Sequence, residues 1–195
     1  HLSIRRQRQM CIRDRKDAEC KVIWYGQDDG DYCAKGVSID DDGTSFTLIH
    51  AKGEARLKMP LFGAHNLQNV VAASALLIES GIDPQEIQKG LSTFEGVARR
   101  QDLVGEAAGV AVIDDFAHHP TAVAKTIDAI RARYPGRRLW ALFEPRSNTS
   151  RRNVFQDLYA KAFSNADRAI IGHVHRADSI PDDERMDIKL SLIHI

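Results

Sequence analysis

The stretch "DDFAHHPT", residues 114–121, decides the fold class because it joins a predicted strand to a predicted helix. The apolar run "VAVI" precedes the two acids, and Pro120 favours the first turn of a helix. Val123, Ile127, Ile130 and Tyr134 then mark one face of that helix. Ligands of open α/β sheets bind beyond the carboxyl ends of strands, so this loop is a candidate binding site.

Downstream of this loop, strand and helix patterns alternate. The run "RRLWALFEP" (137–145) predicts a buried strand, "SRRNVFQDLYAKAF" (150–163) a helix, and "RAIIGHV" (168–174) another strand. Just upstream, "DLVGEAAGVAVIDDF" (102–116) predicts a hairpin, or two strands joined by a turn. Such alternation favours a parallel sheet covered by helices, so the fold class is α/β.

Residues 20–59 predict an antiparallel meander. Four short β-rich runs, separated by turn signals, cover residues 20–26, 34–40, 45–51 and 55–59.

Two helices are expected after the meander. The first spans 66–80 with Gly81 as its C-cap, and the second runs from Pro84 to about residue 91. Asp83 supplies the N-cap of the second, and Glu86 completes a capping box. The segment "STFEGVARRQD" (92–102) has no clear periodicity and is expected to be a linker between domains.

The composition is typical of a globular protein, with 43% hydrophobic and 28% charged residues among 195. The longest apolar runs are too short to span a bilayer, and no signal-peptide pattern occurs. Three cysteines without a CxxC pair indicate free thiols, so we expect a cytoplasmic protein without a membrane partner.

The two ends of the chain look foreign. "MCIRDR" (10–15) and "LSLIHI" (190–195) can be encoded by DNA strings that are reverse complements, as in a transposon adapter read through in translation. We therefore expect residues 1–15 and 190–195 to be artefacts and the chain to be a fragment. The alternative is a native basic arm, "RRQRQ". Those ends carry five of the 27 basic but one of the 27 acidic residues, so the remainder is mildly acidic, which disfavours a nucleic-acid partner.

Two clusters upstream of the central loop carry candidate binding residues. In "GAHNLQN", Asn66 and Asn69 lie on one face of a helix start, and their amides suit the edge of an adenine. Capping by Asn66 is the simpler alternative. In "ARRQD", Arg99 and Arg100 suit phosphate oxygens or form a solvated basic pair.

The central loop offers acids and imidazoles. Asp114 and Asp115 can meet ribose hydroxyls or a metal, although only one of two adjacent acids reaches a given ligand. His118 and His119 can meet phosphate or cap local backbone groups. The pair formed by His173 and His175 is weak support for any site.

The loop "EPRSNTS" follows a predicted strand on the same ligand side. Arg146 can clamp a carboxylate, with Ser147 and Asn148 beside it. The alternative is a plain turn in which Thr149 or Ser150 caps the next helix.

Taken in order, "GAHNLQNVVAA", "FEGVARRQDLVG" and "VIDDFAHHPTAV" resemble the Mur ligase family over nearly all of residues 16–188. The resemblance implies that residues 16–98 are the end of the central ATP-binding domain. Residues 99–189 are then an incomplete, Rossmann-like C-terminal domain with a parallel sheet.

The resemblance also assigns roles. Asn66 and Asn69 approach the adenine of ATP, Asp115 binds its ribose, and Arg100 acts in catalysis by reaching the phosphates. Residues 146–148, which are Arg146, Ser147 and Asn148, read the incoming amino acid or peptide. Magnesium bridges phosphate oxygens, and its ligands are expected upstream of this chain rather than within it.

Within the family, "LWALFEPRSNTSRRNVFQ" is most similar to the ligases that join UDP-N-acetylmuramate to the tripeptide L-Ala-γ-D-Glu-meso-diaminopimelate in peptidoglycan recycling. The alternative is the branch that adds L-alanine in peptidoglycan biosynthesis. In both branches a carboxylate is phosphorylated to an acyl phosphate, which an amine then attacks. The resemblance thereby implies a role in cell-wall growth, cell shape and cell division.

One departure from the family stands out, because no GxxxxGK[ST] phosphate loop occurs in the sequence. We therefore expect no ligase activity from this polypeptide by itself. Two rival hypotheses remain open at this point: a metal-dependent hydrolase using Asp114, Asp115, His118, His119 and His173, and a non-catalytic nucleotide-binding module.

Overall fold

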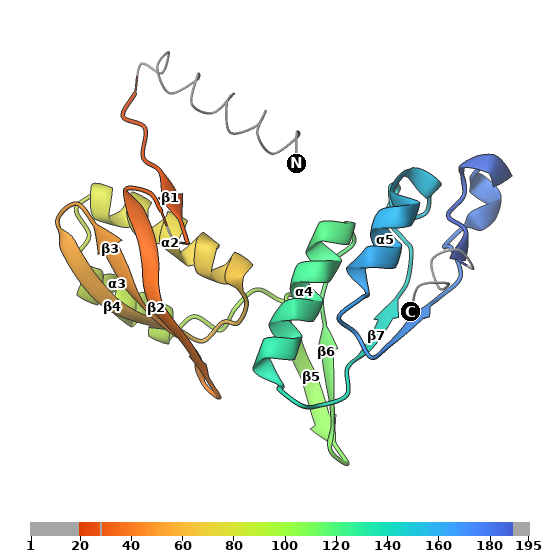
Figure 1. The fold of residues 1–195 in the computed structure, drawn as a ribbon, viewed down its shortest axis with the longest axis horizontal. Coiled ribbons are helices and arrows are strands. Elements are labelled where there is room, and N and C mark those ends of the chain that lie inside the picture. The colour runs from red at the N-terminus through yellow and green to blue at the C-terminus, as the bar shows by residue number, and fades with distance from the viewer. Residues whose placement is uncertain (1–19, 28, 189–195) are drawn as a thin grey trace.

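A computed structural model describes residues 20–27 and 29–188, which form two regions joined by a linker (Figure 1). The first region contains the elements from β1 to α3, and the second contains those from β5 onward. The linker, residues 93–101, has no helix or strand, as predicted. No helix in the described ranges is long and apolar enough to cross a membrane.

The first region is built on a four-stranded sheet in the order β1-β2-β3-β4. The strands β2 (Tyr32–Asp40), β3 (Gly43–His50) and β4 (Gly53–Met59) pair antiparallel, which confirms the predicted meander for these three.

The first predicted strand, 20–26, was wrong in length and direction. The strand β1 is only Tyr25–Gly26, and it pairs parallel to β2. The reason lies in the turn that follows it. The backbone amide of Trp24 donates to Asp31 Oδ2 at 2.8 Å. It therefore bonds to a side chain and not to the backbone of a neighbouring strand. The Tyr32 amide closes the turn on the Trp24 carbonyl oxygen at 3.0 Å.

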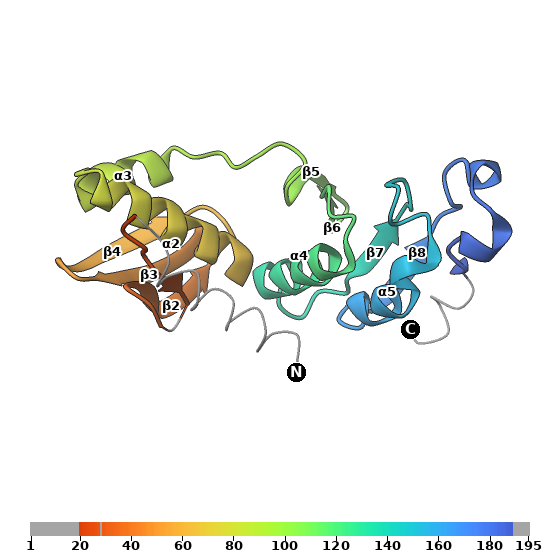
Figure 2. The ribbon, with the colours of Figure 1, turned by 90° about the horizontal axis from the view of Figure 1, so that it is seen from above.

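Two helices cover one face of this sheet (Figure 2). The helix α2 (Ala64–Glu79) begins two residues earlier than predicted, because Gly63 adopts φ 93° and serves as its N-cap. Ser80, rather than Gly81, is the C-cap, and Gly81 follows it with φ 90°. The helix α3 (Pro84–Ser92) begins as predicted, with the Asp83 side chain accepting from the Gln85 amide.

The core of the first region lies between the sheet and these helices. Its central side chains are almost fully buried: Phe46, Leu48, Leu57, Met59, Leu67 and Val71. Each of these strand residues alternates with a more exposed neighbour, as expected of a sheet covered on one face.

The second region starts with the predicted hairpin. The strands β5 (Asp102–Ala107) and β6 (Val110–Asp114) pair antiparallel around a turn at Ala108 and Gly109, both with positive φ. Such φ values match the twist of a two-residue hairpin turn. The helix α4 (Pro120–Arg133) follows with His119 as N-cap and Pro120 at its first position, as predicted.

The strands β7 (Trp140–Phe143) and β8 (Arg168–Ile171) pair parallel, which confirms the predicted direction. Alternate side chains of both strands pack against α4 and α5 (Gln156–Ala162). On the opposite face Leu142 is 75% exposed and Trp140 is 52% exposed. The prediction of a buried strand over 137–145 was therefore wrong for one of its faces, because both packing helices lie on the other.

The helix predicted over 150–163 begins later. A 3-10 turn, η1 (Asn153–Phe155), precedes α5. The delay has a tertiary cause: Arg152 forms an isolated antiparallel bridge with Arg185, and the Met186 amide donates to the Arg151 carbonyl. Two further 3-10 turns, η2 (Ala177–Ser179) and η3 (Asp182–Glu184), carry the chain to that bridge.

The two regions meet where the start of α2 approaches α4 (Figure 2). The Arg133 guanidinium lies 4.6 Å from the centroid of the Phe62 ring. Ala129 is buried and lies close to Gly63. A β-carbon added at Gly63 would lie 2.5 Å from the β-carbon of Ala129. The cavity described next is lined by residues of both regions and of the linker.

Candidate functional site

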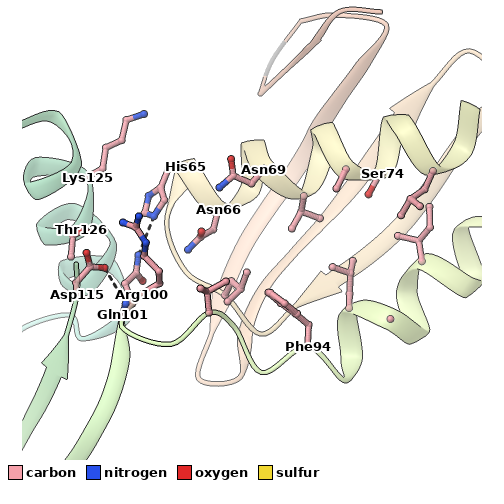
Figure 3. Close-up of a pocket in the computed structure, with 18 of the residues that line it drawn as sticks. His65, Asn66, Asn69, Ser74, Phe94, Arg100, Gln101, Asp115, Lys125 and Thr126 are labelled. Atoms are coloured by element: carbon pink, nitrogen blue, oxygen red, sulfur yellow. Dashed lines mark hydrogen bonds between the residues drawn. The ribbon is translucent and has the colours of Figure 1, made fainter. Parts of the chain in front are cut away.

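A cavity of about 750 Å³ lies between α2, the linker and α4 (Figure 3). Its walls include all four residues for which the family resemblance predicts contact with ATP: Asn66, Asn69, Arg100 and Asp115. They come from segments up to 49 positions apart in the numbering, and the fold brings them to one space. Their roles stay predictions, but their convergence is a property of the structure.

Asp115 is fixed from both sides. Its Oδ2 accepts the Gln101 backbone amide at 3.0 Å, and its Oδ1 accepts the Ala117 amide at 2.7 Å. Asp114 makes a different contact, with its Oδ2 3.0 Å from Arg99 Nε. Adjacent acids thus take different partners, as expected for neighbours at a strand end.

Asn66 does not cap α2 through its N-terminal turn amides. Its Nδ2 donates to the Phe62 carbonyl oxygen at 2.8 Å, which holds the chain entering the helix. Both Asn66 and Asn69 line the cavity, and the side chain of Asn69 is exposed there. The pair therefore keeps polar atoms on the cavity side.

Arg100 and Arg99 flank one aromatic ring. Their guanidinium carbons lie 5.8 Å and 5.5 Å from the centroid of Phe116. The Phe116 amide donates to the Arg99 carbonyl at 2.8 Å, so backbone and side chains together tie the linker to the loop after β6. This arrangement places Arg100, but not Arg99, in the wall of the cavity.

Six further polar residues line the cavity without having been predicted as site residues: His65, Ser74, Glu86, Gln101, Lys125 and Thr126. His65 and Gln101 lie inside the quoted motifs "GAHNLQN" and "ARRQD", so their position was a usable signal. Lys125 and Thr126 lie within an ordinary helical pattern, and no local signal marks them.

His65 joins the two regions. Its Nε2 lies 3.2 Å from Gln101 Nε2, and the neutral ring accepts this hydrogen bond. Burial lowers the pKa of His65, Lys125 and Arg100 lower it further, and Asp115 opposes them. The surroundings of the imidazole therefore favour its neutral form.

The two loop histidines have local structural contacts. His119 Nδ1 accepts the Thr121 amide at 3.3 Å, and its ring packs edge-on against Phe155. His118 Nδ1 lies 3.0 Å from the Phe116 carbonyl oxygen, and its own carbonyl accepts from the Tyr159 hydroxyl. Of the alternatives raised by the sequence, the local capping role fits these contacts.

A second cavity of about 700 Å³ lies on the other side of the same loop. Arg146 and Ser147 line it, together with Asp114 and Asp115. The guanidinium of Arg146 is largely exposed and lies 3.8 Å from Glu144 Oε2.

The rest of the "EPRSNTS" loop is held internally. Ser147 Oγ accepts the Ser150 amide at 3.1 Å, so Ser147 is partly engaged in its own turn. Asn148 is outside the wall of the second cavity and its Oδ1 lies 3.5 Å from Arg152 Nε. Neither Thr149 nor Ser150 caps the following helix.

The hydrolase hypothesis needed several acids and histidines around one ion. Within residues 20–27 and 29–188, no group of three or more His, Cys, Asp or Glu is arranged to hold a metal. His173 is exposed, and His175 uses its backbone amide on the Pro145 carbonyl. The structure gives this hypothesis no ligand set.

Comparison with known proteins identifies the family. Residues 4–77 match the Mur ligase middle domain, and residues 99–188 match the "Mur ligase, glutamate ligase domain". The chain belongs to the Mur ligase family. The predicted fold class is thereby confirmed. The middle-domain match begins at residue 4, within the segment 1–15 for which an adapter origin was predicted. The domain limits 16–98 and 99–189 stay predictions.

Among curated relatives, the UDP-N-acetylmuramate–L-alanine ligase of Nostoc punctiforme is 36% identical over 169 residues, 85% of this chain and 35% of the relative. That of Desulfitobacterium hafniense is 30% identical over 159 residues, 80% of this chain and 35% of the relative. The chain thus spans about a third of the relatives it matches.

Two solved structures are also similar. The murein peptide ligase of Psychrobacter arcticus is 34% identical with a TM-score of 0.51, covering 75% of this chain and 31% of that one. The UDP-N-acetylmuramate–alanine ligase of Thermotoga maritima has a TM-score of 0.69 at 23% identity, over 80% of this chain and 35% of that one, and supports the fold alone.

Proposed function

We propose that this chain is the part of an ATP-dependent ligase that holds the nucleotide and the incoming amine while a C–N bond forms on UDP-N-acetylmuramate. The convergence of Asn66, Asn69, Arg100 and Asp115 on one cavity carries this proposal. Relatives named for this reaction support it.

L-alanine is the favoured amine. The sequence motif favoured the tripeptide, but the curated relatives quoted above are both named as L-alanine ligases. The comparisons therefore support the alternative better than the first expectation. The tripeptide is kept as a second candidate for one reason: the solved murein peptide ligase of Psychrobacter arcticus is 34% identical to this chain.

The cavity suits ATP in its shape and in the chemistry of its walls. Apolar side chains of α2 and α3 form one end, and they suit the faces of an adenine: Val70, Leu77, Ile87, Leu91 and Phe94. The amides of Asn66 and Asn69 suit its polar edge. Asp115 suits ribose hydroxyls, and Arg100 suits phosphate oxygens.

When bound, ATP supplies the phosphoryl group that activates the carboxylate. In this proposal the residues of this chain bind ATP, orient it and shield it from solvent. The carboxylate of Asp115 is pre-oriented by two backbone amides, so it need not be ordered at the moment of binding. Arg100 is held over Phe116 in a direction that leaves its charge at the cavity. Magnesium, when bound with ATP, would offset phosphate charge, and no residue within 20–27 and 29–188 is assigned as its ligand.

We place the amine acceptor in the second cavity. Arg146 is its most exposed cation, and a guanidinium pairs with a carboxylate in bidentate geometry. Both candidate acceptors carry such a carboxylate. Cys20 and Cys33 are free thiols, in keeping with a reducing compartment such as the cytoplasm.

The nucleotide proposal is tested by titrating the purified chain with ATP in a calorimeter. Asp115→Asn and Asn69→Ala are each expected to weaken ATP binding about tenfold, because each removes a hydrogen bond to the ligand. Asp157→Asn, an exposed acid on α5, is the matched control and should leave the affinity unchanged. Equal affinities in all four proteins would refute the assignment.

The acceptor is tested by nuclear magnetic resonance titrations with L-alanine and with the tripeptide. Binding of L-alanine should shift the amide signals of Glu144, Arg146 and Ser147, and Arg146→Ala should abolish those shifts at the other two residues. If only the tripeptide shifts them, the second candidate replaces the first. In an ATP-dependent ligation assay we expect no product from this chain, since its sequence holds no GxxxxGK[ST] loop.

A further inference from the structure

The first cavity continues along α2 past the residues proposed to contact a nucleotide. Asn66 and Asn69 lie near the start of the helix, and the wall goes on through Ala73 and Ser74 to Leu77. Since an α-helix rises about 1.5 Å per residue, Leu77 lies about 12 Å beyond Asn69 along the axis. This length exceeds that of a purine held by its edge at Asn69. Figure 3 shows Ser74 on this farther part of α2, with α3 opposite.

Six residues of α2, α3 and the turn between them form what we call the α2–α3 pocket: Ser74, Leu77, Ile82, Ile87, Gly90 and Leu91. Leu77 and Ile82 expose part of their apolar surface to water, so a ligand that covered them would gain by its removal. Glu86, the acid in this part of the wall, is exposed on the first turn of α3. The pocket therefore favours a neutral, apolar group.

One buried hydroxyl in this pocket has no partner. Ser74 is 1% exposed, and in the part of the chain that the structure describes its Oγ makes no hydrogen bond. A serine in a helix can donate to the carbonyl four residues earlier, as Ser80 Oγ does to Leu76 at 2.8 Å. Ser92 does the same to Gln88. A buried hydroxyl that lacks this bond is unfavourable, and a ligand atom can supply the missing partner.

A water molecule suits this position poorly, because a buried water needs about two to four polar partners. The wall residues next to Ser74 on α2 are apolar, namely Val70, Ala73 and Leu77. Gly90 leaves room on the α3 side, since a β-carbon added there would meet no heavy atom of the described residues within 4 Å. Apolar walls, free space and a single polar anchor are typical of a small-molecule site.

We propose that the α2–α3 pocket binds a neutral, aromatic small molecule whose single hydroxyl or amino group bonds to Ser74 Oγ. An aromatic ring is favoured because Phe94, in the linker, exposes its own ring to the same cavity. The molecule binds beside a nucleotide rather than in its place, because the adenine lies nearer Asn69. The site therefore does not depend on the function proposed above.

The site is tested on the whole 195-residue chain by nuclear magnetic resonance titration with phenol and with toluene. Phenol has an aromatic ring and a hydroxyl, whereas toluene has the ring alone. We expect both probes to shift the amide signals of Ser74, Leu77 and Gly90. Saturation with ATP should leave the affinity for phenol unchanged.

Ser74→Ala separates the hydroxyl from the apolar walls. It should weaken phenol binding about three- to tenfold, because one neutral hydrogen bond is lost, and leave toluene binding unchanged. Alanine favours a helix more than serine does, so the temperature of thermal unfolding should not fall. A loss of phenol binding in this variant is then not a loss of the fold.

Leu77→Ala tests the apolar wall, and Leu76→Ala is its matched control. The two leucines are neighbours on α2, but Leu77 lines the cavity, whereas Leu76 is 69% exposed and is not part of the wall. Leu77→Ala should weaken the binding of both probes about three- to tenfold, because apolar contact is lost. Leu76→Ala should change neither.

Each outcome decides a separate point. If ATP displaces phenol, the pocket belongs to the base of the nucleotide, and the separate site is refuted while the nucleotide function stands. If phenol binds at these residues and ATP does not bind, the separate site stands and the nucleotide function fails. If Ser74→Ala weakens phenol and toluene alike, or Leu76→Ala acts as Leu77→Ala does, the proposed ligand contacts are refuted. Absence of shifts at all three amides refutes the site.

Discussion

The two regions of this chain close their cores to different degrees. In the first, antiparallel strands joined by short turns lie under two helices, and Leu48 and Met59 are fully buried. In the second, the parallel pair β7–β8 is packed on one face, and Leu142 is 75% exposed on the other. The difference teaches that antiparallel sheets complete themselves locally, whereas parallel sheets depend on elements distant in sequence.

The comparison is tested most strongly by truncating one leucine in each region. Leu48→Ala should destabilise the first region by about 2–5 kcal/mol, because it leaves a cavity among buried neighbours. Leu142→Ala should change stability by about 0.5 kcal/mol or less, because its side chain is mostly in water.

Urea unfolding followed by tryptophan fluorescence separates the two effects. Trp24 lies in the first region and Trp140 in the second, and they are the only tryptophans of the chain. Two transitions, of which only that of Trp24 shifts in Leu48→Ala, would sharpen the comparison. A single transition that shifts equally in both variants would break it.

The contact between the regions is the next target. In Gly63→Ala the new β-carbon would come within 2.5 Å of the Ala129 β-carbon, at a residue with φ 93°. We expect a loss of about 1–3 kcal/mol from overpacking and backbone strain.

Gly81→Ala isolates the strain in that prediction, since Gly81 has φ 90° but open space around its α-carbon. Its loss, measured by the same urea unfolding, should be smaller than that of Gly63→Ala. Equal losses would show that strain alone is responsible and that the regions do not press on each other at Gly63.

A smaller effect is expected from Tyr159→Phe in the second region. The buried Tyr159 hydroxyl donates to the His118 carbonyl, and burial raises its pKa to about 12. Removing it should cost about 1 kcal/mol in thermal unfolding, because the carbonyl loses a partner inside the protein. A neutral result would mean that water replaces the hydroxyl and that this part of the second region is open.

The smallest expected effect is a dependence on acid. Asp167 Oδ2 accepts from the Leu139 amide and from Arg131, and these bonds hold its pKa below the usual range. Because the pKa of Asp167 is lower in the folded protein than in the unfolded chain, its ionisation stabilises the fold at pH values above the pKa of the unfolded chain. This stabilisation is lost as pH falls through the pKa of the folded protein. The Trp140 transition of Asp167→Asn should therefore depend less on pH below about 4 than that of the unaltered chain. The same pH dependence in both proteins would contradict this role.

Much of the fold followed from local patterns. Asp83 and Pro84 marked the start of α3, and Pro120 that of α4, because caps and prolines act within a few residues. Asn66 and Asp115, which the sequence singled out at a helix start and a strand end, both line the first cavity, and their roles stay predictions.

What the sequence could not show depended on distant partners. The helix α5 starts late because Arg152 bridges to Arg185, 33 positions away in the numbering. Lys125 reaches the cavity only because α4 lies against the start of α2. Both facts are tertiary, and neither leaves a trace in the neighbouring residues.

One feature of the loop after β6 links the two cavities. Asp115 and Thr126 line both, and the backbone amides of Gln101 and Ala117 fix the two oxygens of Asp115. These two residues, one after β6 and one in α4, are therefore common to the walls of both cavities. Because backbone amides rather than side chains hold this carboxylate, substitutions of the surrounding side chains should leave the boundary between the two cavities in place.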